Sequence, residues 1–218
     1  IASGLTNGTN YAFKIRATNV NGVSGMSGKI GITPMTTSSA LVIQMVKPLN
    51  AGLTVTFGGA IDNGGSVAKN YQYSLDGGAT WKDCVPALTL GPTMTIKSLA
   101  NGTTYQVSIR MVNAVGPGAA SNVVAGTPMT VPSAPLVNSA TASKTSATLT
   151  LGASNNGGST ITGYAYSLDN KAWTSVTPVA GQFTVTDLKS FTTYKIYVRA
   201  TNIMGNGVAA STTVKTLK

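Results

Sequence analysis

The side chains that most often carry catalysis are scarce in this chain of 218 residues. It has no His and no Glu, so the commonest general base is missing. Its carboxylates are Asp62, Asp76, Asp83, Asp169 and Asp187. Asp76 and Asp169 occupy equivalent places in a repeated pattern, so they do not form the neighbouring pair of carboxylates that glycoside hydrolysis requires. We expect no catalytic residue, and a protein that is not an enzyme.

Metal-binding residues are equally few. One Cys and no His exclude an ordinary zinc site. The segment 62–65 (Asp-Asn-Gly-Gly) offers oxygen ligands but lacks the spacing of a calcium loop, and it is typical of a plain turn in which Asp62 bonds to its own backbone. Cys84 cannot form an intrachain disulfide; we expect a small, partly buried residue, with an intermolecular disulfide as the alternative. No metal or other cofactor is predicted.

The charge pattern also argues against a nucleic-acid partner. Fifteen basic and five acidic residues give a net charge of +10. The Lys and Arg residues are scattered from Lys14 to Lys218 without a run of even three, whereas binding along phosphates needs a clustered footprint. The longest apolar stretch, residues 40–46, contains Gln44 and is too short to span a membrane. Charged residues make up only 9%, and Thr, Ser, Asn and Gly take their place, as in all-β proteins with tight turns.

A repeated pattern organises the chain. In every copy a Leu precedes a Tyr by six residues, an Arg follows that Tyr by five, and an Asn follows the Arg by three. The matching residues are Leu5, Tyr11, Arg16 and Asn19, then Leu99, Tyr105, Arg110 and Asn113, then Leu188, Tyr194, Arg199 and Asn202. Tyr11 and Tyr105 are 94 residues apart, and Tyr105 and Tyr194 are 89 apart, which is the length of a small domain.

The front half of this unit occurs only twice. Residues 63–66 match 156–159, residues 71–76 match 164–169, and Trp81 matches Trp173. The sequence therefore predicts two complete domains, preceded by the last strands of a third. Because a lone half-sandwich lacks an opposing sheet, we expect the natural polypeptide to extend upstream of Ile1.

Apolar and polar residues alternate along the strands that follow each Leu-to-Tyr turn. The alternation places Tyr105, Val107, Ile109 and Met111 inward in the second copy, and Tyr194, Ile196, Val198 and Ala200 inward in the third. In the first copy Tyr11, Phe13, Ile15 and Ala17 share one face. Further strands are predicted around residues 53–57, 71–73, 149–151 and 164–166, and no segment has helical periodicity.

Six residues are candidates for surface contacts. They are Arg16, Arg110, Arg199, Trp81, Trp173 and Tyr197. Each Arg points outward, and we expect its stem to lie across the sheet and pack on an aromatic ring, such as Tyr197 in the third copy; a ligand-binding stripe is the alternative. Trp81 and Trp173 either fill the core from another strand or form exposed platforms for a glycan.

The Leu-to-Tyr spacing, the alternation ending in Ala-x-Asn, and Pro-Ser-Ala-Pro at 132–135 resemble the fibronectin type III family. Asn-Asn-Gly-Gly-Ser at 155–159 resembles a turn of its bacterial and phage versions. The resemblance implies all-β, immunoglobulin-like sandwiches in tandem. One departure is that the family's buried Trp on the second strand is replaced here by Phe57 and Leu151.

The domain boundaries follow from the repeat and from two short linkers that contain Pro. We predict the C-terminal strands of an incomplete domain at 1–34, a complete domain at 35–129 and a second at 130–218. Because Pro fixes its own backbone, the domains should follow one another end to end as an elongated rod.

These features favour a non-catalytic structural or adhesive repeat protein. We expect a spacer, fibre or decoration component, extracellular or on the surface of a virus particle or cell, whose partners are other protein subunits. The alternative is an accessory or carbohydrate-binding region of a larger secreted polysaccharide-active enzyme, with glycans as partners.

Overall fold

The computed structural model describes residues 1–59, 62–85 and 92–218. Every regular element in this described part is a β-strand, as predicted. The chain divides into two compact units. The first comprises residues 1–46, 54–95 and 105–126, and the second comprises 47–53, 96–104 and 127–218. The predicted boundaries at 34/35 and 129/130 stay predictions.

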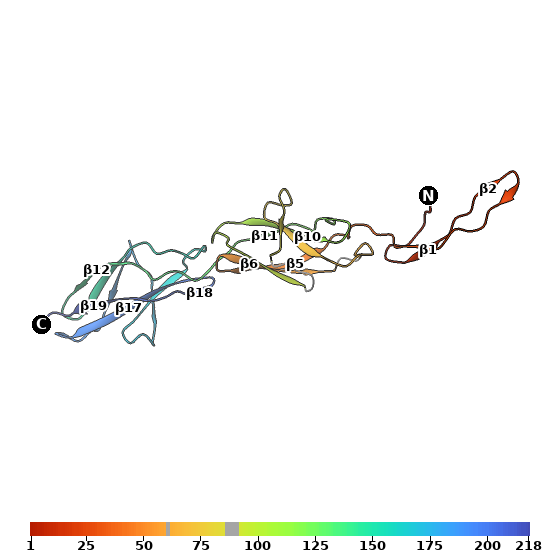
Figure 1. The fold of residues 1–218 in the computed structure, drawn as a ribbon. Helices are drawn as coiled ribbons and strands as arrows, with labels where there is room; N and C mark the ends of the chain where they lie inside the picture. Colours follow the sequence, from red (N-terminus) through yellow and green to blue (C-terminus); the bar gives the residue numbers. More distant parts are fainter. Residues whose placement is uncertain (60–61, 86–91) are drawn as a thin grey trace. The chain divides into compact units, whose positions relative to one another are not determined.

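The N-terminal segment forms one long hairpin without a core, with two short paired stretches. β1 (Tyr11–Phe13) pairs with β4 (Ile30–Ile32), and β2 (Thr18–Asn19) pairs with β3 (Gly22–Val23) (Figure 1). No side chain of residues 1–34 is buried. Ile15, on the face predicted to be apolar, is 77% exposed, because this segment has no second sheet against it in the described part of the chain. Its alternation therefore marks a strand face but not a buried one.

The middle sandwich consists of two sheets. One has the order β5 (Val42–Leu49), β6 (Gly52–Gly58), β9 (Thr93–Lys97); the other has the order β11 (Val124–Gly126), β10 (Tyr105–Val112), β7 (Asn70–Ser74), β8 (Lys82–Asp83). As predicted, the alternating side chains Val107, Ile109 and Met111 are buried, while Tyr105 is half-buried. The rings of Phe57 on β6 and Tyr71 on β7 lie 5.3 Å apart, which joins the two sheets through apolar packing.

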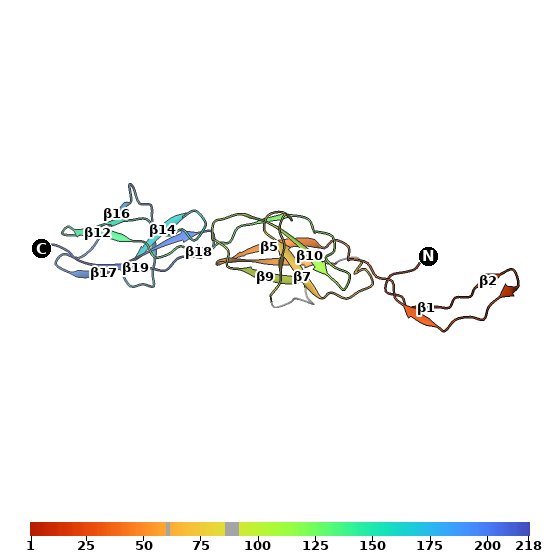
Figure 2. The same ribbon diagram turned by 45° about the horizontal axis from the view of Figure 1, so that its top comes forward.

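The C-terminal sandwich repeats this arrangement (Figures 1 and 2). One sheet has the order β12 (Val137–Ala142), β13 (Ala147–Leu151), β16 (Gln182–Val185); the other has the order β15 (Thr174–Val176), β14 (Gly163–Ser167), β17 (Thr193–Asn202), β18 (Gly205–Asn206), with β19 (Ala210–Lys215) also paired to β17. Its core consists of Ala147, Leu149, Phe183, Val185, Leu188, Ile196, Val198 and Val214. These come from both sheets, so the two layers bury a common apolar interior.

Two turns that recur in the repeat are joined at one end of these sheets by a buried Asn. Asn202 is 3% exposed, and its side-chain amide donates to the carbonyls of Thr130 and Asn156, each at 2.8 Å. Its carbonyl oxygen accepts from the Met204 backbone N–H at 2.8 Å. The carboxamide thus holds the segment that leads to β12, the turn before β14 and the turn after β17.

Asn113 makes the same contacts in the middle sandwich. Its amide donates to Thr36 O at 2.8 Å and to Asn63 O at 3.0 Å. Its oxygen accepts from the backbone N–H groups of Val115 and Gly116. The Asn of the repeat is therefore structural in both complete copies.

The turns whose carbonyls accept from these Asn amides contain a Gly that no other residue can replace without strain. Gly157 has φ +71°, and a Cβ added there would lie 2.2 Å from the carbonyl oxygen of Thr130. The equivalent Gly64 has φ +72°, and a Cβ would lie 2.1 Å from Thr36 O. Only Gly allows the linker strand to approach this closely.

We predict that Asn202→Ala destabilises the C-terminal sandwich by about 2 kcal/mol, because two carbonyls lose their donor. Asn202→Asp is the isosteric comparison. It keeps the acceptor for Met204 but not the two donated bonds, so it should cost as much. Urea unfolding followed by circular dichroism measures both. A loss below about 0.5 kcal/mol in either variant would contradict the structural role.

We also predict that Gly157→Ala lowers the free energy of unfolding by at least about 2 kcal/mol, through strain at positive φ and the clash with Thr130 O. Gly163→Ala is the matched control, since nothing lies within 4 Å of its added Cβ. Thermal unfolding of the two variants should separate them clearly. Equal melting temperatures would show that the turn relaxes around the methyl group.

Candidate functional site

The outer face of the β7–β8–β10 sheet carries a closed set of polar contacts. Arg110 on β10 is opposite Gln72 on β7, and Gln72 is opposite Asp83 on β8. The Arg110 guanidinium lies over the Trp81 ring, 4.2 Å from its centroid, and its Nε donates to Gln72 Oε1 at 2.7 Å. Gln72 Nε2 in turn donates to Asp83 Oδ1 at 2.9 Å. The cation therefore has an aromatic ring, an amide and, through that amide, a carboxylate as internal partners.

The same face of the C-terminal sandwich keeps the cation and the ring but not the other partners. The Arg199 guanidinium lies over Trp173, 4.0 Å from the ring centroid. The residue opposite Arg199 on β14 is Ala165, and the residue opposite Ala165 on β15 is Ser175. Arg199 Nε is buried and has no hydrogen-bond partner within the described residues. Two small side chains thus replace the amide and the carboxylate.

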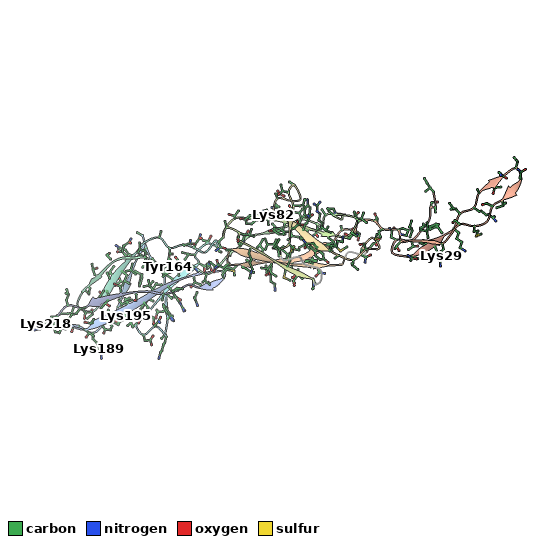
Figure 3. The ribbon with its side chains drawn as sticks, viewed as in Figure 1. Lys29, Lys82, Tyr164, Lys189, Lys195 and Lys218 are labelled. Atoms are coloured by element: carbon green, nitrogen blue, oxygen red, sulfur yellow. The ribbon has the colours of Figure 1, made fainter. Side chains whose placement is uncertain are left out.

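A hollow of about 450 Å³ opens at this place. It is lined by Thr162, Gly163, Tyr164, Ala165, Trp173, Ser175, Val176, Thr177, Arg199, Thr201 and Asn206. Figure 3 labels Tyr164, which reaches the hollow from β14. Most of these side chains carry hydroxyl or amide groups, and Arg199 is the one charged residue among those that line it.

The structure decides between the two positions considered for the Trp residues and corrects the expected partner of Tyr197. Trp81 and Trp173 do not fill the core; each is half-buried on the outer face beneath an Arg, and Trp81 Nε1 donates to Gly78 O at 3.0 Å. The prediction that Arg packs on an aromatic ring is confirmed for Arg110 and Arg199. The named partner was wrong, because Tyr197 lies under Lys195, whose Nζ is 5.2 Å from the ring centroid.

The third predicted Arg lies apart from such a cluster. Arg16 is exposed in the N-terminal segment, which contains no Trp. The six candidate surface residues are therefore not one site. The structure brings them together in pairs, Arg110 with Trp81 and Arg199 with Trp173, and the role of these pairs in binding stays a prediction.

Two carboxylates are held in tight turns rather than presented for chemistry. Hydrogen bonds from the Ser74 and Thr80 side chains and from the Thr80 backbone hold the pKa of Asp76 well below its ordinary value of 3.8. Backbone N–H groups of Lys171 and Ala172, with the Ser167 hydroxyl, lower the pKa of Asp169 in the same way. Both carboxylates stay ionised at neutral pH and are poor general bases.

The other side chains that could take part in catalysis or metal binding are held within the fold. Asp62 Oδ1 accepts from the Gly64 backbone N–H at 2.8 Å, as expected for a turn. Cys84 is a free, half-buried thiol, as predicted, and burial followed by the charge of Asp83 raises its pKa. Within residues 1–59, 62–85 and 92–218, no three His, Cys, Asp or Glu side chains gather as a metal site. The same residues include no helix of the length and apolarity that crossing a bilayer requires.

Sequence analysis missed the difference between the two Arg–Trp pairs. The signal was present in the aligned repeat, where Tyr71-Gln72-Tyr73 matches Tyr164-Ala165-Tyr166. It became meaningful only when the strand register placed Gln72 and Ala165 opposite the two Arg residues.

We predict that the double variant Asp76→Asn/Asp169→Asn loses less stability than the natural chain when the pH is lowered. Because both folded pKa values are lowered, the carboxylates stabilise the fold above their ordinary pKa of 3.8, and this is lost as the pH falls through the folded values. Calorimetry from pH 7 to pH 2 should show a smaller fall in Tm for the variant than for the natural chain. Asp62→Asn, which leaves both carboxylates in place, is the control. Parallel Tm curves would contradict the prediction.

Three comparisons relate the chain to known proteins. No curated protein matches it. Among solved structures it is similar to the FN1–FN3 domains of chicken CNTN1, with 21% identity over 98% of this chain and 80% of that chain and a TM-score of 0.41. The model of the fibronectin type III domain matches residues 132–216. This range contains both sheets of the C-terminal sandwich and the core between them. Residues 132–216 are a fibronectin type III domain.

Proposed function

We propose that the chain is a structural or adhesive repeat protein without catalytic activity. It would serve as a spacer, fibre or decoration component, extracellular or on the surface of a virus particle or cell. Its partners would be other protein subunits of that assembly. Bacterial or phage origin of these domains belongs to the same proposal.

The observation that carries this proposal is that several ionisable side chains are bonded to other residues of the same sandwich, which leaves them unavailable for catalysis. The carboxylates of Asp76 and Asp169 are bound in turns, and Asp83 is bound to Gln72. Arg110 is stacked on Trp81. Charged residues make up only 9% of the chain, and uncharged surface packs against another subunit without the cost of desolvating charges.

A second candidate function is the accessory or carbohydrate-binding region of a larger secreted polysaccharide-active enzyme. The hollow beside Trp173, with its hydroxyl and amide lining, favours it. Arg199 covers one face of the Trp173 ring, however, so that face is not free for a sugar to stack on it.

Surface exposure can be tested by brief trypsin treatment of intact particles and intact cells from the source culture, followed by mass spectrometry of the released peptides. We expect peptides of this chain among them, released before any cytosolic marker protein. Lys and Arg occur along the whole chain, so cleavage sites are available throughout. Recovery of the chain only from the cytosolic fraction of broken cells would contradict the proposal.

A further inference from the structure

Arg199 differs from Arg110 in a way that indicates a missing acceptor. Both guanidinium groups stack on a Trp and project from the same place in the sheet. Arg110 Nε has the Gln72 oxygen at 2.7 Å, whereas Arg199 Nε is buried and unpaired within the described residues. Buried donors almost always have a partner, and leaving one unpaired costs about 1–3 kcal/mol.

The substitutions that remove the partner also create the space for a replacement. Gln72 and Asp83 of the middle sandwich correspond by register to Ala165 and Ser175. The hollow of about 450 Å³ lies at these two small residues and is within the usual range for small-molecule sites. An incoming ligand would thus occupy the place that the amide and the carboxylate fill in the other copy.

The charge around the hollow selects an anion. Arg199 is the one ionised side chain in its lining, and no Asp lines it. The whole chain carries +10, which adds a favourable long-range field. In the middle sandwich Arg110 donates to the Gln72 amide oxygen, and Gln72 donates in turn to the Asp83 carboxylate. A ligand carboxylate would supply both the acceptor oxygen and the negative charge that Ala165 and Ser175 lack, and it suits a guanidinium by charge and by shape.

The residues around the hollow indicate which kind of molecule carries the carboxylate. Ser175 and Thr177 line the hollow with residues that carry hydroxyl groups, and the hydroxyl of Thr162 donates to the Thr201 carbonyl at 3.2 Å. Asn206 lines the hollow, and its side-chain oxygen accepts from the Thr201 hydroxyl at 2.8 Å, which leaves its amide N–H groups as donors. A ring with several hydroxyls matches this lining better than a peptide, whose apolar side chains would leave these groups unpaired.

We propose that this hollow is a binding site for a carboxylate-bearing sugar, such as a hexuronic acid residue of an acidic polysaccharide. The carboxylate accepts from the Arg199 guanidinium, which Trp173 holds in place from the other side. Since Nε is covered, a small shift of the Arg199 side chain accompanies binding. The inference rests on the second candidate function above, carbohydrate binding, and deepens it by naming the class of sugar.

The test is calorimetric titration of the complete chain with trigalacturonic acid, with its methyl ester as the neutral form of the same sugar. We expect saturable binding of the acid at one site, weakened by added salt, and binding of the ester reduced at least tenfold. The double variant Ala165→Gln/Ser175→Asp places the partners of the middle sandwich in the hollow. It should lose at least tenfold in affinity while keeping its Tm, because Arg199 gains an internal acceptor.

Two further variants make the result decisive. Arg199→Gln should also lose at least tenfold, and it replaces the double variant if that protein does not fold. Gln72→Ala/Asp83→Ser in the middle sandwich removes the internal partners of Arg110 and should create a second site. The proposal would be overturned if trigalacturonic acid did not bind, or if Ala165→Gln/Ser175→Asp and Arg199→Gln bound it with unchanged affinity. Equal binding of end-blocked triaspartate would overturn the sugar and assign the site to an acidic protein segment.

This test is independent of where the protein resides. Binding by the purified chain combined with a cytosolic location would refute the surface role and leave the site intact. A surface location without binding would do the reverse.

Discussion

The buried carboxamide of the repeat is the contact on which each complete sandwich depends. In each complete sandwich the segment before the first strand, the turn before the third strand and the turn that follows the repeated Asn are distant in sequence and must be fixed at one end. Asn202 reaches all three with two donated bonds and one accepted bond, and Asn113 does the same. Aspartate lacks the donors and a shorter side chain lacks the reach, so the pattern needs Asn at this place.

The close approach that Asn requires explains the neighbouring glycines. The Asn amide bonds both to the linker strand and to the turn, so the two must nearly touch. Gly157 and Gly64 lie at this point with positive φ, with the linker carbonyl where a side chain would be. The Asn-Gly-Gly-Ser sequence and the distant Asn are thus two halves of one structural unit, which accounts for their joint occurrence in both complete copies.

Local alternation was sufficient to predict the strands and the inward faces, because successive side chains of a strand point to opposite faces of the sheet. Val107 and Ile109, like Ile196 and Val198, are fully buried as expected. The sequence left Trp81 and Trp173 open between the core and the surface for a physical reason. Hydrophobicity favours the core for Trp, but here a cross-strand Arg covers the ring, and such neighbours depend on register, which one strand's sequence does not specify. The alternation of residues 11–17 likewise states which residues share a face, not whether another sheet covers them.

The two Arg–Trp pairs show how the outer face of a repeated scaffold can differ between copies without a change of fold. The outer face of a sheet is separated from the core by the backbone, so Gln72 and Asp83 can differ from Ala165 and Ser175 while the inward residues keep their packing. The stacked Trp restrains the guanidinium in both copies, so removing its acceptors leaves the cation ordered rather than released to solvent. An ordered cation has lost most of its side-chain entropy before a ligand arrives, and binding there costs correspondingly less. Function in this chain is therefore to be sought where equivalent positions of the repeat differ on an exposed sheet face, and structure where they agree.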